Sequence, residues 1–346
     1  MNNTKIRTTT KDHCYLCDSK GSNLYKGLKD RLFGVKGVWN IDKCSNDDCG
    51  LLWLNPMPVA EDLPKLYETY YTHTHDPLPK EANWLVQVFR DGCSDYLKKK
   101  YLYPYNSSFF SKLIATIIKF NPKWTANLDF SVFYLPAIPN GKLLEIGCGS
   151  GGMLKNMQDK GWDVTGVDFD KKSVSVAQNL GLNVYEGDIS QLNLEKNSFD
   201  AIIMNHVIEH LPDPVTTLKE CNDLLRSSGR LISITPNTDG LNHNKYNSNS
   251  RILEPPRHLF IYNKNSLKEV AIKAGFKKSS CFTSVHGFSG FSWASEQLLK
   301  NGQLGTDPKI PKIKLLLLSS KELISGYLLK LRLVEGDEVV LTARKK

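Results

Sequence analysis

The period of apolar positions changes along the chain and divides it into parts. From Gly141 onward, short apolar runs alternate with stretches whose apolar residues recur at helical spacing. Short apolar runs bounded by turn residues predict buried strands, and a 3.6-residue period between them predicts helices that cover those strands. This alternation is typical of βαβ units, so we expect an α/β fold with a parallel sheet covered on both faces.

Seven strands and several covering helices are expected in this part. The strands are KLLEIG (142–147), DVTGVD (163–168), LNVYEG (182–187), DAIIMN (200–205), RLISIT (230–235), KKSSCFTSV (277–285) and EVVLTARK (338–345). The helices are GMLKNMQDKG (152–161), KKSVSVAQNLG (171–181), PVTTLKECNDLLRSSG (214–229) and SLKEVAIKAG (266–275). A helical insertion, residues 287–336, separates the last two strands.

The chain before residue 126 follows a different pattern. Residues 1–72 are loop-like, with paired cysteines and scattered aromatic residues, and predict a small separate module. Residues 73–125 contain the apolar segments NWLVQVF and FFSKLIATIIKF and predict a helical linker or lid. Residues 126–346 form the expected α/β domain.

Composition is that of an ordinary soluble protein, with 346 residues of which 40% are hydrophobic. The N-terminus has no apolar leader, and no run approaches the roughly 18 apolar residues of a spanning helix, so we expect a cytoplasmic protein. The net charge of +9 divides into +5 for residues 1–125, zero for 126–286 and +4 for 287–346. Basic flanks suit a phosphorylated acceptor, an anionic membrane or a nucleic acid, or they serve solubility alone.

Four of the eight cysteines form two close pairs, Cys14 with Cys17 and Cys44 with Cys49. In a reducing compartment such pairs favour a metal over disulfides, and four thiolates suit tetrahedral zinc. The second pair encloses four residues where two are usual, which leaves His13 as an alternative ligand. Reduced thiols without a metal are the other interpretation.

The stretch LLEIGCGSGG (143–152) predicts a strand that turns sharply into a helix around a ligand. Its glycines satisfy two patterns. Gly147, Gly149 and Gly152 match the dinucleotide fingerprint G-x-G-x-x-G, whereas Glu145, Gly147, Gly149 and Gly151 match the E-x-G-x-G-x-G loop of proteins that bind S-adenosylmethionine. The local motif does not choose between them.

Two acids further along the chain favour S-adenosylmethionine over a nicotinamide cofactor. Asp168, at the end of the second strand, suits the ribose of either ligand. Asp188, at the end of the third strand, suits the exocyclic amine of adenosine, for which a dehydrogenase has no general need. Glu145 stands where it can hold a methionine amino group. The plain alternative is that Asp188 is a turn acid and Phe169 a core aromatic.

With these residues in register, the chain resembles class I S-adenosylmethionine-dependent methyltransferases. The resemblance implies a Rossmann-like seven-stranded sheet whose last strand is antiparallel. It also implies that Asp168 binds the ribose and that Phe169 and Ile189 enclose the adenine. Asn205 and the glycine turn are further cofactor-binding residues by the same resemblance. The segments CYLC and KCSNDDCGLLWLNPMP resemble the zinc-ribbon-like module that precedes the catalytic domain in many bacterial methyltransferases.

Methyl transfer needs reactants in line and, for a hydroxyl acceptor, a base. His206, His210 and His258 all follow expected strands, at the sheet edge where open α/β folds bind ligands. We favour His258, because two prolines stiffen EPPRHLF and the adjacent Arg257 can bind a phosphate or carboxylate of the substrate. Reaction without a protein base is the alternative. His206 to His210 also spells H-x-x-E-H, the inverted zinc-protease signature, but three fixed positions make a weak motif.

The acceptor is inferred from resemblance alone. Methyltransferases that join a cysteine-rich segment to this core resemble enzymes acting on sugars, either nucleotide-linked or in surface polysaccharides. HVIEHLPDP also resembles quinone-pathway methyltransferases, so O-methylation of a small aromatic or lipid acceptor is the alternative. RNA methylation and a non-catalytic cofactor-binding protein are less favoured. No RNA-recognition signature is present, so we expect no nucleic-acid partner.

The segment from Lys312 to Leu333 combines apolar and basic residues at helical spacing. A stripe with basic residues around it suits a helix lying on an anionic membrane and predicts peripheral contact with the inner membrane face. The residues of this stripe are Leu316, Leu323, Tyr327 and Leu331. The favoured alternative is packing on the core, because residues 315–318 are apolar all round and read as buried.

Overall fold

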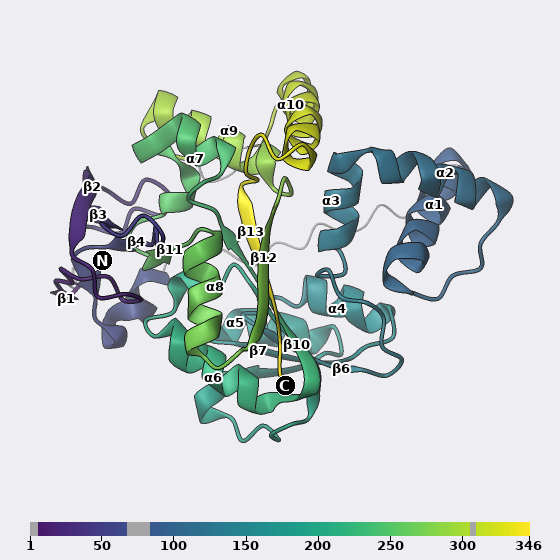
Figure 1. The fold of residues 1–346 in the computed structure, drawn as a ribbon, viewed down its shortest axis with the longest axis horizontal. Coiled ribbons are helices and arrows are strands. Elements are labelled where there is room, and N and C mark those ends of the chain that lie inside the picture. The colour runs from purple at the N-terminus through teal and green to yellow at the C-terminus, as the bar shows by residue number, and fades with distance from the viewer. Residues whose placement is uncertain (1–5, 68–83, 305–308) are drawn as a thin grey trace.

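A computed structural model describes residues 6–67, 84–304 and 309–346. Its centre is a seven-stranded sheet with the strand order β12-β13-β10-β9-β6-β7-β8 (Figure 1). The five strands from β6 to β10 run parallel, and β13 is antiparallel to both of its neighbours. The expected α/β fold with an antiparallel last strand is therefore confirmed. The strands are β6 (Lys142–Ile146), β7 (Asp163–Asp168), β8 (Asn183–Glu186), β9 (Phe199–Asn205), β10 (Leu225–Pro236), β12 (Lys278–Ser284) and β13 (Glu338–Arg344).

Alternating residues of the strands build two apolar cores. On β9, Ile202 and Met204 belong to one core, whereas Ala201 and Ile203 belong to the other. The first core includes buried residues of α6 (Pro214–Leu224) and α8 (Lys264–Lys273), and the second includes those of α4 (Gly152–Asp159) and α5 (Lys171–Asn179). Each large apolar side chain removed from water stabilises the fold by roughly 1.5–3 kcal/mol.

One helix is shorter than its sequence pattern predicts. The pattern extends it to residue 229, but α6 ends at Leu224 and β10 begins at Leu225. Leu225 pairs with Phe199 of β9, and the pairing shifts register before Arg230. The neighbouring strand offers backbone partners to this segment, and that tertiary contact outweighs local helix propensity.

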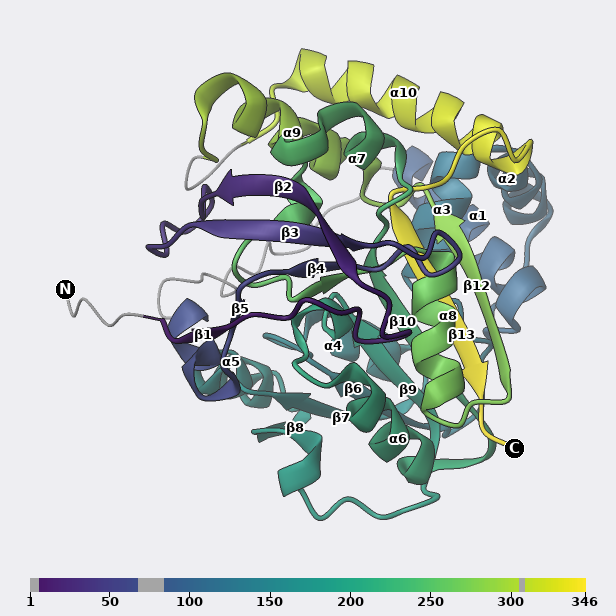
Figure 2. The same ribbon diagram turned by 60° about the vertical axis from the view of Figure 1, so that its left-hand side comes forward.

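The N-terminal segment forms a four-stranded sheet with the order β11-β4-β3-β2. Its edge strand β11 (Phe260–Ile261) comes from the chain after β10 and pairs antiparallel with β4. The segment is therefore joined to the α/β domain by backbone pairing, and Figure 2 shows the two sheets side by side. Its remaining elements are β1 (Thr8–Thr9), β2 (Gly21–Leu28), β3 (Trp39–Cys44), β4 (Leu52–Leu54), β5 (Met57–Pro58) and the 3₁₀ helix η1 (Ala60–Tyr67). The predicted boundary at residue 72 lies outside the described residues.

Two groups of helices stand beside the sheet. The helices α1, α2 and α3 form one end of the molecule, and α7, α9 and α10 lie along its top in Figure 1. Both α9 and α10 occur between β12 and β13. The helices are α1 (Trp84–Tyr101), α2 (Phe109–Phe120), α3 (Pro122–Phe130), α7 (Leu241–Tyr246), α9 (Phe288–Asn301) and α10 (Lys312–Lys330), and the short 3₁₀ turns are η2 (Ile189–Gln191), η3 (Ile208–His210), η4 (Asn247–Asn249) and η5 (Arg251–Leu253).

The expectation that residues 315–318 are buried is wrong for three of the four. Leu318 is buried, but Leu315, Leu316 and Leu317 are exposed. Leu316 and Leu317 lie away from the face by which α10 packs on α3 and α9, and that outer side of the helix stays largely exposed. Among the described residues, no helix is both long and apolar enough to cross a membrane.

Candidate functional site

The turn between β6 and α4 is built from glycines with positive φ: Gly147 at 70°, Gly149 at 52° and Gly151 at 81°. A Cβ on Gly147 would lie 2.3 Å from a Val207 methyl group, and one on Gly151 would lie 2.5 Å from a Leu182 methyl group. A Cβ on Gly149 would meet no described atom within 4 Å. The turn therefore requires glycine for its backbone and leaves the backbone of Gly149 open toward a ligand.

Two acids at the ends of neighbouring strands flank this turn. Asp168 accepts hydrogen bonds from the backbone N–H groups of Gly149 at 2.8 Å and Asp170 at 2.9 Å. Glu145 is buried, and its Oε2 has no hydrogen-bond partner among the described residues. Burial raises the pKa of Glu145 to about 8, and the charge of Asp168 adds to the effect. A buried, unpaired carboxyl is the group that a ligand ammonium would satisfy.

The other residues expected to bind a cofactor lie at the carboxyl ends of β7, β8 and β9. Phe169 is exposed and packs edge to face on Tyr67, with ring centroids 4.9 Å apart. Ile189 is buried, while exposed Asp188 accepts a hydrogen bond from the Ser190 N–H. The buried Oδ1 of Asn205 has no partner among the described residues. An aromatic face, carboxylates and open polar atoms on one sheet edge fit an adenosine ligand with an amino acid tail.

His206 lies directly after β9, with φ at +54°. Its Nε2 donates to Glu338 Oε1 at 3.0 Å, and its Nδ1 lies 3.3 Å from Glu209 Oε1. Burial disfavours the charged imidazole, but the two carboxylates outweigh burial and raise the pKa of His206 to about 10. The two carboxylates thus favour the protonated form of His206, which has no lone pair with which to accept a proton.

A second histidine shares the same carboxylate. His286 Nδ1 donates to Glu338 Oε2 at 2.9 Å, and its ring stacks on Phe130 with centroids 3.6 Å apart. Sequence reasoning missed His286, although the signal was present. The residue follows an expected strand, 277–285, just as the three chosen histidines do.

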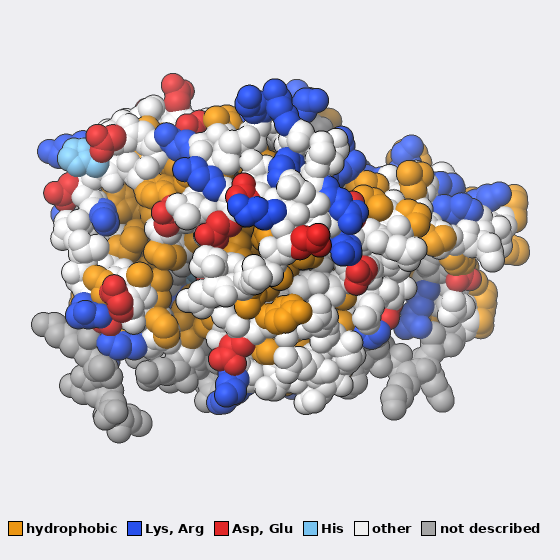
Figure 3. Space-filling view, turned by 90° about the horizontal axis from the view of Figure 1, so that it is seen from below, with side chains coloured by type: hydrophobic (Ala, Val, Ile, Leu, Met, Phe, Trp, Pro, Cys, Tyr) orange, Lys and Arg blue, Asp and Glu red, His pale blue; other side chains and the backbone are white. Residues whose placement is uncertain are grey.

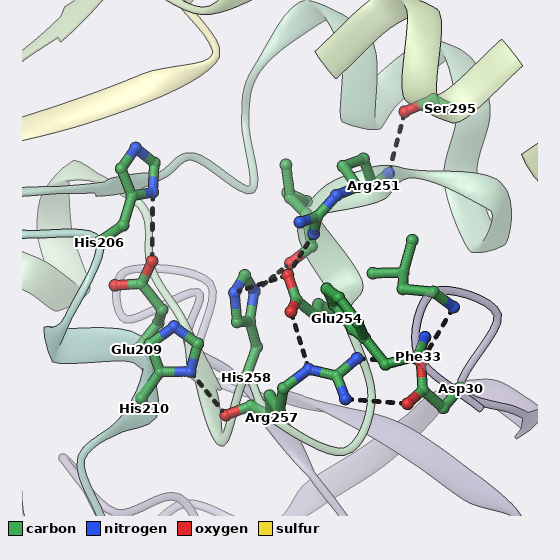
Figure 4. A network of polar contacts seen from close by, with 12 residues as sticks. Asp30, Phe33, His206, Glu209, His210, Arg251, Glu254, Arg257, His258 and Ser295 are labelled. Atoms are coloured by element: carbon green, nitrogen blue, oxygen red, sulfur yellow. Dashed lines mark hydrogen bonds and ion pairs between the residues drawn. The ribbon is translucent and has the colours of Figure 1, made fainter. Parts of the chain in front are cut away.

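The structure places His258 and Arg257 in the interior, contrary to their expected exposure to substrate. His258 Nδ1 donates to the Ile252 carbonyl at 2.6 Å, and burial lowers the pKa of His258 to about 4. Arg257 is buried, and its guanidinium donates to Asp30 at 2.8 and 2.9 Å and to Glu254 at 2.8 Å (Figure 4). Each of the three guanidinium nitrogens already donates to a carboxylate, so Arg257 ties the N-terminal segment to this loop.

His210 remains half-exposed. Its Nδ1 donates to the Arg257 carbonyl at 3.0 Å, and the Tyr67 hydroxyl lies 3.0 Å from the same nitrogen. Potential ligand atoms of Glu209, His210 and His258 lie within 4.8 Å of one another, a group that does not include His206. The two histidines of the inverted zinc-protease signature are therefore not brought together as a ligand pair.

The four paired cysteines converge. The Sγ atoms of Cys14 and Cys49 lie 3.7 Å apart, those of Cys17 and Cys44 lie 3.4 Å apart, and all four lie within 4.8 Å of one another. In tetrahedral zinc with Zn–S bonds of 2.3 Å, sulfur atoms are about 3.8 Å apart, so the geometry fits the metal. His13 is exposed and is not a member of this group.

Comparison with known proteins shows what the α/β domain is similar to. Residues 120–280 match the family model of the methyltransferase domain. Ubiquinone biosynthesis O-methyltransferase of Alkalilimnicola ehrlichii is 30% identical over 117 residues, covering 32% of this chain and 47% of that protein. The enzyme of the same name from Coxiella burnetii is 34% identical over 101 residues, covering 28% of this chain and 43% of that protein. The chain thus spans less than half the length of these relatives.

Among solved structures, phosphoethanolamine N-methyltransferase 2 of Haemonchus contortus with S-adenosyl-L-methionine has a TM-score of 0.45 at 16% identity. That match covers 90% of this chain and 70% of the other chain. So distant a likeness carries no argument about function. The family match, which spans less than half of the chain, and the sheet order together support a class I, S-adenosylmethionine-dependent methyltransferase domain.

The buried contacts of Arg257 predict a large effect on stability. Replacing Arg257 by Met leaves Asp30 buried without its guanidinium partner and Glu254 with the guanidinium of Arg251 alone, and we expect a loss of about 3–5 kcal/mol in the free energy of unfolding. Denaturant titration followed by circular dichroism measures it. Arg226→Met, which breaks a more exposed pair with Asp200, is the control and should cost less than about 1 kcal/mol. Equal effects of the two variants would contradict a structural role for Arg257.

Proposed function

We propose that this protein transfers a methyl group from S-adenosylmethionine to a hydroxyl acceptor. The observation that carries the proposal is the unpaired, buried carboxyl of Glu145 beside the open backbone of Gly149 and the carboxylate of Asp168. A cofactor with an ammonium group at one end and ribose hydroxyls further along supplies the partners that these groups lack. A nicotinamide cofactor has no ammonium group for Glu145.

Individual residues take distinct parts in holding the cofactor. Asp168 accepts from the ribose hydroxyls, because two backbone N–H groups already hold its carboxylate in place. Phe169 and Ile189 enclose the adenine, and the free carboxylate oxygen of Asp188 accepts from its amine. The cofactor supplies a methyl group activated by a sulfonium, so the protein's main tasks are alignment and removal of the acceptor proton.

We propose His286 as the base that removes the acceptor proton. Its Nδ1 donates to Glu338, which leaves Nε2 as the nitrogen with a lone pair, and its ring is half-buried after β12. Glu338 also bonds to His206 and favours its protonated form. In this proposal His206 therefore lies near the acceptor as a cation and does not take up the acceptor proton. His210 has the second most suitable geometry, whereas the interior position of His258 argues against the role first expected for it.

The acceptor class has two candidates. The cysteine-rich segment before the catalytic domain supports a sugar, either linked to a nucleotide or in a surface polysaccharide. The ubiquinone biosynthesis O-methyltransferases of 30–34% identity support a quinone-like aromatic hydroxyl. Both classes include acceptors carried on a lipid, and we propose that this protein meets its acceptor at a membrane surface.

We also propose that Cys14, Cys17, Cys44 and Cys49 hold a structural zinc ion. The segment that contains them has few elements of its own, and its sheet is completed only by β11. A metal bound by four thiolates would stabilise the loops that carry them where apolar burial is small.

Cofactor identity is tested by calorimetric titration with S-adenosylhomocysteine and, separately, with NAD. We expect binding of the first alone. Asp168→Ala should weaken it by about 1.5–3 kcal/mol through loss of charge-assisted bonds to the ribose, whereas Asp163→Ala, at the exposed start of β7, should leave it unchanged. Binding of NAD without binding of S-adenosylhomocysteine would overturn the proposed function.

The raised pKa of Glu145 predicts proton release on binding. In the free protein at pH 7 the carboxyl is largely protonated because its pKa is about 8, and a ligand ammonium favours the ionised form. Affinity for S-adenosylhomocysteine should therefore rise from pH 6 toward pH 8, with about one proton released per molecule bound near pH 7. Titration in buffers of different ionisation enthalpy measures this number. Glu145→Gln should bind without that release, and an unchanged release in this variant would assign the proton elsewhere.

Metal content tests the zinc proposal. Protein purified without an affinity tag should contain about one equivalent of zinc, because four thiolates complete one tetrahedral site. Cys44→Ser should lower the zinc content and the thermal stability, while Cys281→Ser, outside the cluster, should change neither. Full folding of the wild-type protein with no bound metal would refute the proposal.

A further inference from the structure

The surface of α10 is apolar along one face of the helix. Ile313 is 79% exposed, Leu316 69% and Ile324 58%, although large apolar side chains of this kind are usually buried. At roughly 100° of rotation per residue, these positions fall on one stripe. The other exposed apolar residues of this stripe are Leu317, Tyr327 and Leu331.

The opposite face of α10 holds the helix to the protein. Leu318, Glu322 and Ser325 are buried on it. Glu322 accepts a hydrogen bond from Ser289 of α9, and Lys123 of α3 lies 3.5 Å from the same carboxylate. The stripe therefore points away from the domain because polar contacts fix the rotation of the helix.

Basic residues flank the stripe on both sides. Lys312 and Lys330 lie about 100° to one side of it, and Lys321 lies about 80° to the other, where Lys314 is paired with Glu296 of α9. Glu322 is the one acidic residue of α10, and it is buried. Long lysine side chains in this arrangement reach past an apolar face toward anionic groups beside it.

The helix α2 extends this surface. Its exposed apolar side chains include Phe109, Phe110 and Phe120, and α2 contains Lys112 and Lys119 but no acid. The Tyr327 hydroxyl of α10 donates to the Phe120 carbonyl, so the C-terminal ends of the two helices touch. Figure 3, seen from the side opposite to α10, shows that hydrophobic side chains interspersed with Lys and Arg also occur on the underside of the end that contains α1 and α2.

We propose that α10 and α2 form a surface that binds an anionic lipid membrane. Apolar side chains enter the boundary between headgroups and acyl chains, and the flanking lysines contact the anionic headgroups. A second copy of the chain fits less well, because pairing two such faces would bring lysines against lysines. Charge complementarity thus selects the membrane as the occupant.

This surface lies close to the proposed site of reaction. If the protein methylates a lipid-linked acceptor, as the proposed function holds, membrane binding would bring the acceptor to that site. The helix α9 begins two residues after His286, and Phe130 at the end of α3 stacks on the His286 ring. A lipid-linked acceptor could therefore reach the carboxyl edge of the sheet while its lipid stays in the bilayer.

Vesicle flotation of the full-length protein tests the proposal. We expect binding at low salt to vesicles of phosphatidylcholine mixed with phosphatidylglycerol, and little binding to phosphatidylcholine alone. Two variants should each lose vesicle binding by about ten-fold or more. They are the triple variant Ile313→Gln, Leu316→Gln, Ile324→Gln and the double variant Lys312→Glu, Lys330→Glu. Matched controls away from the surface are Leu180→Gln with Ile272→Gln and Lys171→Glu with Lys278→Glu, which should bind as the wild type does.

Two further measurements separate the possible outcomes. Titration with S-adenosylhomocysteine should show equal cofactor binding by the wild type and all variants. Absence of cofactor binding would contradict the proposed function, whereas the flotation result tests the membrane surface alone. Sedimentation velocity of the wild type reports self-association. Wild-type protein that binds neither kind of vesicle, variants that float as it does, or a wild-type dimer that the triple variant converts to monomer would each overturn the membrane assignment.

Discussion

The buried guanidinium of Arg257 is the contact on which the arrangement of the molecule depends. It joins Asp30 of the N-terminal segment to Glu254 of the loop after β10, all three side chains being buried. The same loop carries His258 and leads into β11, which completes the N-terminal sheet. Charges without water must be paired, so this contact fixes the loop at one position and orientation. The carbonyl of Arg257 accepts a hydrogen bond from His210. This bond connects the buried ion pairs of Arg257 to the edge of the candidate site.

A second carboxylate, Glu338, organises the opposite side of the site. It receives His206 from the end of β9 and His286 from the end of β12, two strands that are not neighbours in the sheet. This is possible because β13 runs antiparallel and begins where the parallel strands end. The reversed last strand thus brings Glu338, at its start, to the edge of the sheet where β9 and β12 end and are followed by His206 and His286.

The sequence predicted the sheet and the glycine turn well, because both depend on local patterns: apolar runs for the strands and positive φ for the turn. The roles expected for Arg257 and His258 depended on exposure, which a local pattern does not reveal. Arg257 is buried because Asp30, distant in sequence, neutralises it. Likewise Leu316 and Leu317 are exposed because the elements that contact α10 cover its other face, and their apolar character alone gave no sign of that.

The pairing of β11 with β4 has a consequence for synthesis. The N-terminal strands leave the ribosome first, but the strand that closes their sheet is made only after β10. Until then β4 exposes an unpaired backbone edge, which is a template for aggregation in a nascent chain. Zinc would restrain the loops around the cysteines during this interval but would leave that edge open. The N-terminal sheet therefore stays open at this edge until translation has passed β11.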